Sequence, residues 1–167
     1  MVTFCKVKED IRDGNRAYDA GDYKKSIESF HKAETERPED PRLQYNIGGA
    51  AYQLGEYEKA QDYFNKALGT TDVALEAKTH YNLGNTFFKM QDYPQAIKSY
   101  ETALKLDPND VNAKVNLELA RRMLKENTKP QQNQQQNQQG ENQQNQDQQN
   151  QQQNQQQNQQ QQDQQQQ

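Results

Sequence analysis

Residues 77–110 read AKTHYNLGNTFFKMQDYPQAIKSYETALKLDPND, and the chain contains two earlier copies of this stretch. Its pentapeptide YNLGN, at residues 81–85, is nearly repeated as YNIGG at residues 45–49. The segments DAGDYKKSIESFHKA, QLGEYEKAQDYFNKA and KMQDYPQAIKSYETA align with one another without a gap. Self-similarity with a period of about 34 residues is typical of a solenoid, in which each copy packs against its neighbours.

Small and large residues recur at fixed positions of the three copies. Gly14 and Gly48 are 34 residues apart, while Gly48 and Gly84 are 36 apart, because the linker GTTDVALE after Leu68 carries two extra residues. A glycine inside a helix costs about 1 kcal/mol against alanine, so three in register predict close approach of helices. We expect large rings to fill the space beside them, namely those of Phe30, Phe64 and Tyr100.

Each copy has the pattern of two amphipathic helices. In the third copy, Leu83 and Phe87 share one helical face, a break follows at Gln91, and apolar residues then recur at helical spacing. Pro108 ends the second helix, because proline cannot continue it.

This pattern resembles the tetratricopeptide repeat, and residues 77–110 match it almost throughout. The resemblance implies an all-α fold, a right-handed superhelix of antiparallel helix pairs in residues 1–126. Three repeats, at about residues 7–40, 41–76 and 77–110, are followed by a C-terminal capping helix at 111–126. The chain departs from the family at three positions: Asp13 replaces an apolar residue, Asp72 a proline and His80 a tryptophan.

The predicted capping helix begins like a fourth copy and continues as a single helix. A capping helix needs an apolar side for the stack and a charged side for water. Val115 and Leu119 share one face, whereas Lys114, Glu118 and Arg121 lie elsewhere. We therefore expect Val115 and Leu119 to pack against the third copy.

The remaining residues, 127–167, have the composition of a disordered tail. From Gln131 to Gln167 all 37 positions are Gln or Asn, with the exceptions of Gly140, Glu141, Asp147 and Asp163. Such a segment has too few apolar groups to offset the entropy of ordering it. It would act as a solubilising tether, or it would self-associate through Gln and Asn ladders.

The extended linker, the third copy, the cap and the glutamine-rich tail together resemble the tetratricopeptide proteins of bacterial aerotolerance (Bat) operons. That resemblance implies a protein that works beside von Willebrand A domain proteins and a MoxR-type ATPase. The expected location is periplasmic or membrane-associated if an export signal has been removed, and cytoplasmic otherwise. No apolar run approaches the roughly 20 residues that a membrane-crossing helix needs.

Charge and motifs argue against several function classes. The residues before Gln131 hold 21 acidic and 20 basic side chains, a balance that does not favour nucleic acid binding. His31 and His80 lie 49 residues apart, and the chain has no Gly-rich phosphate loop, HExxH or GxSxG motif. Cys5 is the single cysteine and has no neighbouring ligand residues. We expect no catalytic activity, cofactor or metal.

One face of the first helix in each copy is a candidate binding surface. Asparagine amides can hold a peptide backbone, aromatic rings offer apolar contact, and cations favour an acidic segment. In the third copy this face lies apart from Leu83 and Phe87. The first copy places Lys8, Tyr18 and Asp19 on the equivalent face, and the predicted partner-binding residues are Arg12, Asn15, Arg42, Tyr45, Asn46, Tyr52, Lys78, Tyr81, Asn82, Asn85, Phe88 and Lys89.

The co-chaperone members of the family hold a C-terminal carboxylate with two lysines, two asparagines and an arginine. Asn15, Asn46 and Lys78 match that motif, but Ile11 replaces one lysine and Asn82 replaces the arginine. Each lost charge-assisted contact is worth roughly 1.5–3 kcal/mol, so this site is not the preferred interpretation.

The sequence therefore predicts an interaction scaffold that binds a peptide or partner protein in its groove, within a bacterial envelope-associated complex. The alternative is a structural protein that oligomerises through its repeats or its Gln/Asn-rich tail.

Overall fold

The computed structural model describes residues 2–128, with side chains from residue 6 onward. The expected disordered tail lies, from residue 129 on, outside the described residues. Residues 2–128 form seven helices and no strand. These are α1 (Val2–Asp19), α2 (Tyr23–Glu36), α3 (Pro41–Gln53), α4 (Tyr57–Ala67), α5 (Val73–Lys89), α6 (Tyr93–Leu106) and an unlabelled helix at residues 111–128, which we call the C-terminal helix.

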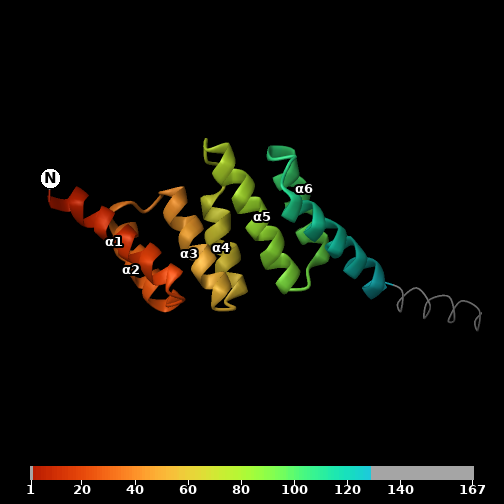
Figure 1. The fold of residues 1–167 in the computed structure, drawn as a ribbon, viewed down its shortest axis with the longest axis horizontal. Helices are drawn as coiled ribbons and strands as arrows, with labels where there is room; N and C mark the ends of the chain where they lie inside the picture. The colour runs from red at the N-terminus through yellow and green to blue at the C-terminus, as the bar shows by residue number, and fades with distance from the viewer. Residues whose placement is uncertain (1, 129–167) are drawn as a thin grey trace, which may run out of the picture. The chain divides into compact units, whose positions relative to one another are not determined.

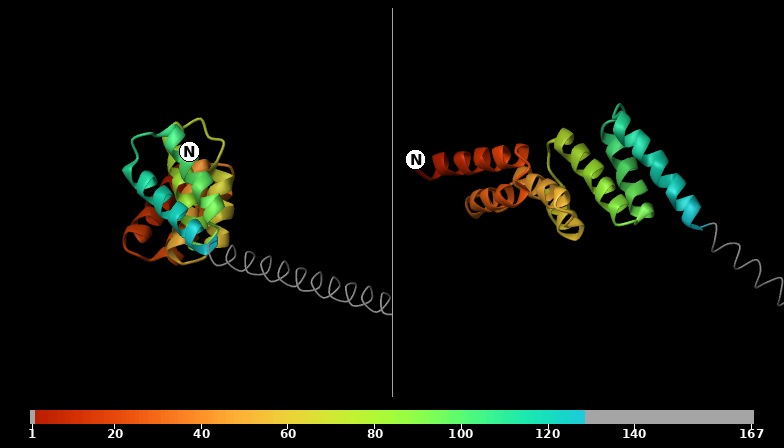
Figure 2. Two further views of the ribbon diagram at one scale, coloured as in Figure 1. Left: turned by 90° about the vertical axis from the view of Figure 1, so that its right-hand side faces the viewer. Right: turned by 60° about the horizontal axis from the view of Figure 1, so that its bottom comes forward.

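The helices pack as antiparallel pairs within the compact unit Met1–Leu124. The most extensive contacts join α1 to α2, α3 to α4 and α5 to α6, and smaller ones join α2 to α3 and α4 to α5. Figures 1 and 2 show the pairs following one another in chain order, with the C-terminal helix beside α6. The repeat therefore corresponds to one helix pair, as its sequence pattern predicts.

Aspartates fix the start of most of these helices. The carboxylates of Asp22, Asp40 and Asp92 accept hydrogen bonds from backbone N–H groups at the starts of α2, α3 and α6. Asp72 does the same for α5, accepting from the backbone N–H of Leu75 at 3.1 Å. The hydrogen bond from Leu75 is the main cause that lowers the Asp72 pKa. The residue that departs from the family pattern therefore serves as a helix cap.

The glycines in register lie against the predicted rings. A Cβ atom on Gly14 would lie 2.6 Å from the Phe30 ring, and one on Gly48 would lie 2.8 Å from Phe64. Gly84 faces Tyr100 more closely still. Each ring is at most 1% exposed, so the close approach predicted from the repeat is confirmed.

The predicted packing face of the C-terminal helix is wrong. Val115 is 60% exposed, whereas Ala113, Leu117 and Ala120 are buried against the stack. The helix keeps the register of a repeat's first helix: these three residues lie 34 positions after Thr79, Leu83 and Thr86, which are also buried. Val115 thus faces away from the third copy, whereas Leu119 is half-buried and lines the hollow where this helix meets α5.

Candidate binding groove

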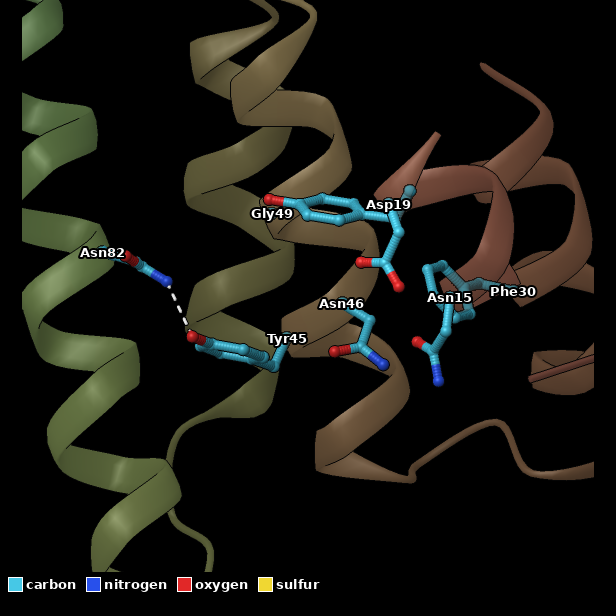
Figure 3. Close-up of a pocket in the computed structure, with 8 residues that line it drawn as sticks. Asn15, Asp19, Phe30, Tyr45, Asn46, Gly49 and Asn82 are labelled. Atoms are coloured by element: carbon cyan, nitrogen blue, oxygen red, sulfur yellow. Dashed lines mark hydrogen bonds between the residues drawn. The ribbon is translucent and has the colours of Figure 1, made fainter. Parts of the chain in front are cut away.

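A hollow of about 420 Å³ lies between α1, α3 and α5 (Figure 3). We call it the first hollow; its lining residues are Asn15, Tyr18, Asp19, Phe30, Tyr45, Asn46, Gly49 and Asn82. The odd-numbered helices contribute all of these except Phe30, which belongs to α2. This hollow therefore lies on the face predicted from the first helix of each copy.

The asparagine amides in this hollow differ in whether they form hydrogen bonds within the protein. Asn82 Nδ2 donates to the Tyr45 hydroxyl at 2.9 Å, which joins α5 to α3 (Figure 3). Burial raises the Tyr45 pKa, so the phenol stays protonated. Asn15 and Asn46 make no side-chain hydrogen bond with any described residue. Their amides are therefore available to a ligand, whereas Asn82 also stabilises the fold.

A second hollow, of about 160 Å³, lies where the C-terminal helix meets α5. Asn85 Oδ1 accepts from the Tyr100 hydroxyl at 2.8 Å and from Asn116 Nδ2 at 2.9 Å, and Asn116 also donates to the Tyr81 hydroxyl at 3.3 Å. Burial raises the Tyr100 pKa far above its ordinary value, which keeps this donor protonated. The residues lining the second hollow are Tyr52, Asn85, Phe88, Lys89, Tyr100, Asn116 and Leu119.

Asn116 is a groove residue that the sequence interpretation missed. It lies 34 residues after Asn82 and 70 after Asn46, at the same position of the fourth, partial copy. This repeat register could have identified Asn116 from the sequence. The residue was overlooked because the C-terminal helix was interpreted only as a cap.

The predicted cations fall into two classes. Arg12 lies 3.4 Å from a Glu9 carboxylate oxygen, and Arg42 lies 3.3 Å from Asp72. Lys78 and Lys89 are exposed and form no ion pair within residues 6–128. The two lysines are therefore the cations most available to a ligand.

The structure does not bring all the predicted residues into one site. Asn15, Tyr45, Asn46 and Asn82 share the first hollow, and Tyr52, Asn85, Phe88 and Lys89 share the second. Lys78 lines a separate hollow of about 350 Å³, which Asp107 and Asp110 also line. Arg12, Arg42 and Tyr81 line none of these three hollows.

Within the described part of the chain, no three His, Cys, Asp or Glu residues are placed to hold a metal ion. None of the helices in residues 2–128 is both long and apolar enough to cross a membrane. His80 lies 3.8 Å from Glu76, and burial lowers its pKa.

Protein-family models and solved structures match the chain. Residues 12–74 and residues 77–110 each match the tetratricopeptide repeat. No curated protein matches the chain. The first TPR of Spaghetti (RPAP3), bound to the HSP90 peptide SRMEEVD, is 26% identical with a TM-score of 0.67, over 71% of this chain and 93% of that one.

Two further solved structures are similar. The Sgt2 TPR domain from Aspergillus fumigatus is 26% identical with a TM-score of 0.67, covering 73% of this chain and 81% of that one. The TPR2AB domain of yeast Sti1, in complex with pHSP90, is 26% identical with a TM-score of 0.65, covering 72% of this chain and 48% of that one.

Proposed function

Because the chain belongs to the tetratricopeptide repeat family, we propose that it is a non-catalytic scaffold that binds a peptide segment of a partner protein in the groove. We define the groove as the first and second hollows together with Lys78. The observation that supports this most directly is the first hollow, where the amides of Asn15 and Asn46 lack partners among the described residues. Similar domains hold an HSP90 peptide and pHSP90.

The bound segment carries acidic residues. Lys78 and Lys89 are exposed and unpaired within the described residues, and they lie 11 residues apart on α5, about three helical turns. An acidic segment along α5 would meet both ammonium groups and gain affinity and association rate from them. Binding should weaken as salt rises, because exposed cations are screened over about 8–10 Å at ordinary ionic strength.

A peptide selected from a random library on the purified chain tests this function. Its affinity, measured by calorimetry, should fall about tenfold in Lys78→Glu, because the change sets like charge against the acidic segment. Lys98→Glu makes the same charge change on an exposed part of α6 outside the groove and is the matched control. Equal affinity of the peptide for all three proteins would contradict the proposal.

Asn82→Ala is unsuitable as a groove variant. It removes the hydrogen bond between Asn82 and the Tyr45 hydroxyl, and therefore changes the packing of α5 on α3. Asn46→Ala removes a groove amide without an internal partner and should weaken peptide binding while leaving the circular dichroism spectrum unchanged.

Self-association is a second candidate function, and the exposed face of the C-terminal helix favours it. Val111 and Val115 are 67% and 60% exposed, one turn apart. Beside them lies a shallow hollow of about 500 Å³, lined by Lys114, Val115, Glu118, Leu119 and Arg122. This is the end of the stack that no further repeat covers within the described residues.

The charges on this face suit a second copy of the chain. Asp110, Lys114, Glu118 and Arg122 are spaced one turn apart and alternate in sign. When two copies of this helix pack antiparallel about a two-fold axis, the two rows run in opposite directions. Lys114 of each copy then meets Glu118 of the other, and Asp110 meets Arg122. Glu118 also pairs with Arg121 at 2.7 Å, but Arg121 keeps a second partner in Glu101.

Light scattering over a concentration series tests the dimer. Val115→Glu should remove any rise in mass with concentration, whereas Val73→Glu, at another exposed valine, should not. Lys114→Glu should weaken association, and the double variant with Glu118→Lys should restore it, because the swapped row is again self-complementary. A monomer mass at every concentration in the unmodified chain would rule the dimer out.

A narrower setting for the scaffold is an envelope-associated complex with von Willebrand A domain proteins and a MoxR-type ATPase. Its support is the sequence order of linker, third copy, cap and glutamine-rich tail. In that setting the chain would act in the periplasm or at the membrane after removal of an export signal. Calorimetry with a von Willebrand A domain protein encoded beside this chain tests it: saturable binding that Lys78→Glu weakens supports the setting, and no binding contradicts it.

A further inference from the structure

The first hollow has an unusual charge for a site that would take a carboxylate. Among its eight lining residues Asp19 is the only charged one. Asp19 makes no ion pair with any described residue. In Figure 3 its carboxylate points into the space beside the amides of Asn15 and Asn46. A bound carboxylate would meet like charge here, whereas a cation would meet a free counter-charge.

The backbone around Asp19 also favours a cation over an anion in this hollow. Asp19 is the last residue of α1, and a helix C-terminus carries the negative end of the helix dipole. The two arginines predicted on the same face are already engaged: Arg12 with Glu9 and Asp13, and Arg42 with Asp72. Neither arginine lines the first hollow.

Two tyrosine rings make the hollow suitable for a flat or elongated cation. Tyr18 is held edge-on against Tyr23, with ring centroids 5.3 Å apart, and Tyr45 packs against Phe64 at 5.8 Å. Gly49 leaves the space beside Tyr18 open, since a Cβ atom there would lie 3.8 Å from that ring. Aromatic faces attract ammonium and guanidinium groups, most strongly where water is partly excluded.

We propose that the first hollow is a subsite for a cationic side chain of the bound segment, with arginine as the preferred residue. Its guanidinium group donates to the Asp19 carboxylate and to the amide oxygens of Asn15 and Asn46, and it stacks on the rings of Tyr18 and Tyr45. This rests on the proposed function, because the arginine belongs to the segment that the groove binds. The groove then binds acidic residues of the segment at Lys78 and Lys89, and a basic residue of the segment at Asp19.

The probe that tests the subsite alone is N-acetyl-L-argininamide, which lacks the acidic residues of the full segment. Titrated into the ¹⁵N-labelled chain, it should shift the amide resonances of Tyr18, Asp19, Asn46 and Gly49. Binding should saturate with a millimolar dissociation constant, on the order of 1–10 mM for so small a ligand. N-acetyl-L-glutaminamide, which is neutral, and N-acetyl-L-glutamate amide, which is acidic, should leave these resonances in place.

Asp19→Asn should weaken binding of the arginine probe about tenfold, since it removes one charge-assisted contact. Asp13→Asn makes the same change on the same helix, at a residue that lines a different hollow, and should leave binding unaltered. Tyr18→Leu should also weaken the probe, because it removes a ring face. The helical circular dichroism signal of each variant checks that it is folded.

The two proposals fail in different ways. Equal binding of the probe to the unmodified chain and to Asp19→Asn, shifts confined to other residues, or no shift at all would each overturn the cationic subsite. Those results leave the effect of Lys78→Glu on a selected peptide untouched. Loss of the Lys78 effect with a normal response to the arginine probe would instead overturn the acidic-segment part of the proposed function and keep the subsite.

Discussion

Gly84 and Gly49 are both helical glycines, yet their surroundings are opposite. A Cβ atom on Gly84 would collide with the Tyr100 ring, which is 1% exposed and cannot move aside. We expect Gly84→Ala to lower the free energy of unfolding by about 1–3 kcal/mol through overpacking. Gly49→Ala should raise it by roughly 0.5–1 kcal/mol, because only Tyr18 lies near, at 3.8 Å. Urea denaturation of both variants measures the difference, and a stabilised Gly84→Ala would contradict the packing described.

His80 makes the stability depend on pH. Burial holds its pKa below the ordinary value of 6.5, although Glu76 opposes this. As pH falls below about 6.5, His80 takes up a proton more readily in the unfolded chain than in the folded chain, so stability falls as pH decreases. We expect the melting temperature to drop less in His80→Phe than in the unmodified chain between about pH 7 and pH 5.5. Equal drops would show that His80 does not contribute.

Residue by residue, the sequence was informative where three copies could be compared. The contacts of Gly14, Gly48 and Gly84 could be predicted because the same small and large positions recur. The hydrogen bond of Asn82 could not be predicted, because an asparagine on a groove face can bond to a ligand or to a neighbouring hydroxyl equally well. Only the position of Tyr45 on the adjacent helix decides between them.

Among the elements, the C-terminal helix shows the limit of reasoning from apolar spacing. Its sequence offers two apolar sides, one with Val115 and Leu119 and one with Leu117 and alanines. The larger side chains favoured the first, but the repeat register requires the second, because small residues allow the helix to approach α6. Alignment with Asn82 and Leu83 would have identified Leu117 as the buried residue.

The register yields a prediction for this helix. Leu117 is 7% exposed and packs in a cluster with Ala96, Tyr100 and Ala120. Leu117→Asp should lower the free energy of unfolding by about 2–5 kcal/mol, because it buries a charge and removes apolar contact. Val115→Asp, two residues earlier and exposed, should change it by less than about 0.5 kcal/mol. Hydrogen exchange should show the loss of protection first in α5, α6 and the C-terminal helix; an equal effect of both variants would contradict the register.

For the whole described unit, similarity in fold to a peptide-binding domain does not imply that the same peptide is bound. The chain resembles a domain bound to SRMEEVD along almost the full length of that domain. Yet the first hollow has a different charge from the one that a terminal carboxylate needs. Ile11 packs against the cluster of Val7, Phe30 and Leu43, where a lysine would be expected, and Asn82 is bonded to Tyr45.

We therefore expect the chain to bind SRMEEVD at least two orders of magnitude more weakly than the first TPR of Spaghetti (RPAP3) does. Two missing charge-assisted contacts, each worth roughly 1.5–3 kcal/mol, account for about that factor, and repulsion by Asp19 adds to it. Calorimetry of both proteins in the same buffer measures the ratio. Asp19→Asn should recover part of the lost affinity, because it removes the like charge without supplying a cation. Comparable affinity of the two proteins would mean that Lys78 and the asparagines suffice to hold the carboxylate, and that the charge at Asp19 does not govern what the first hollow accepts.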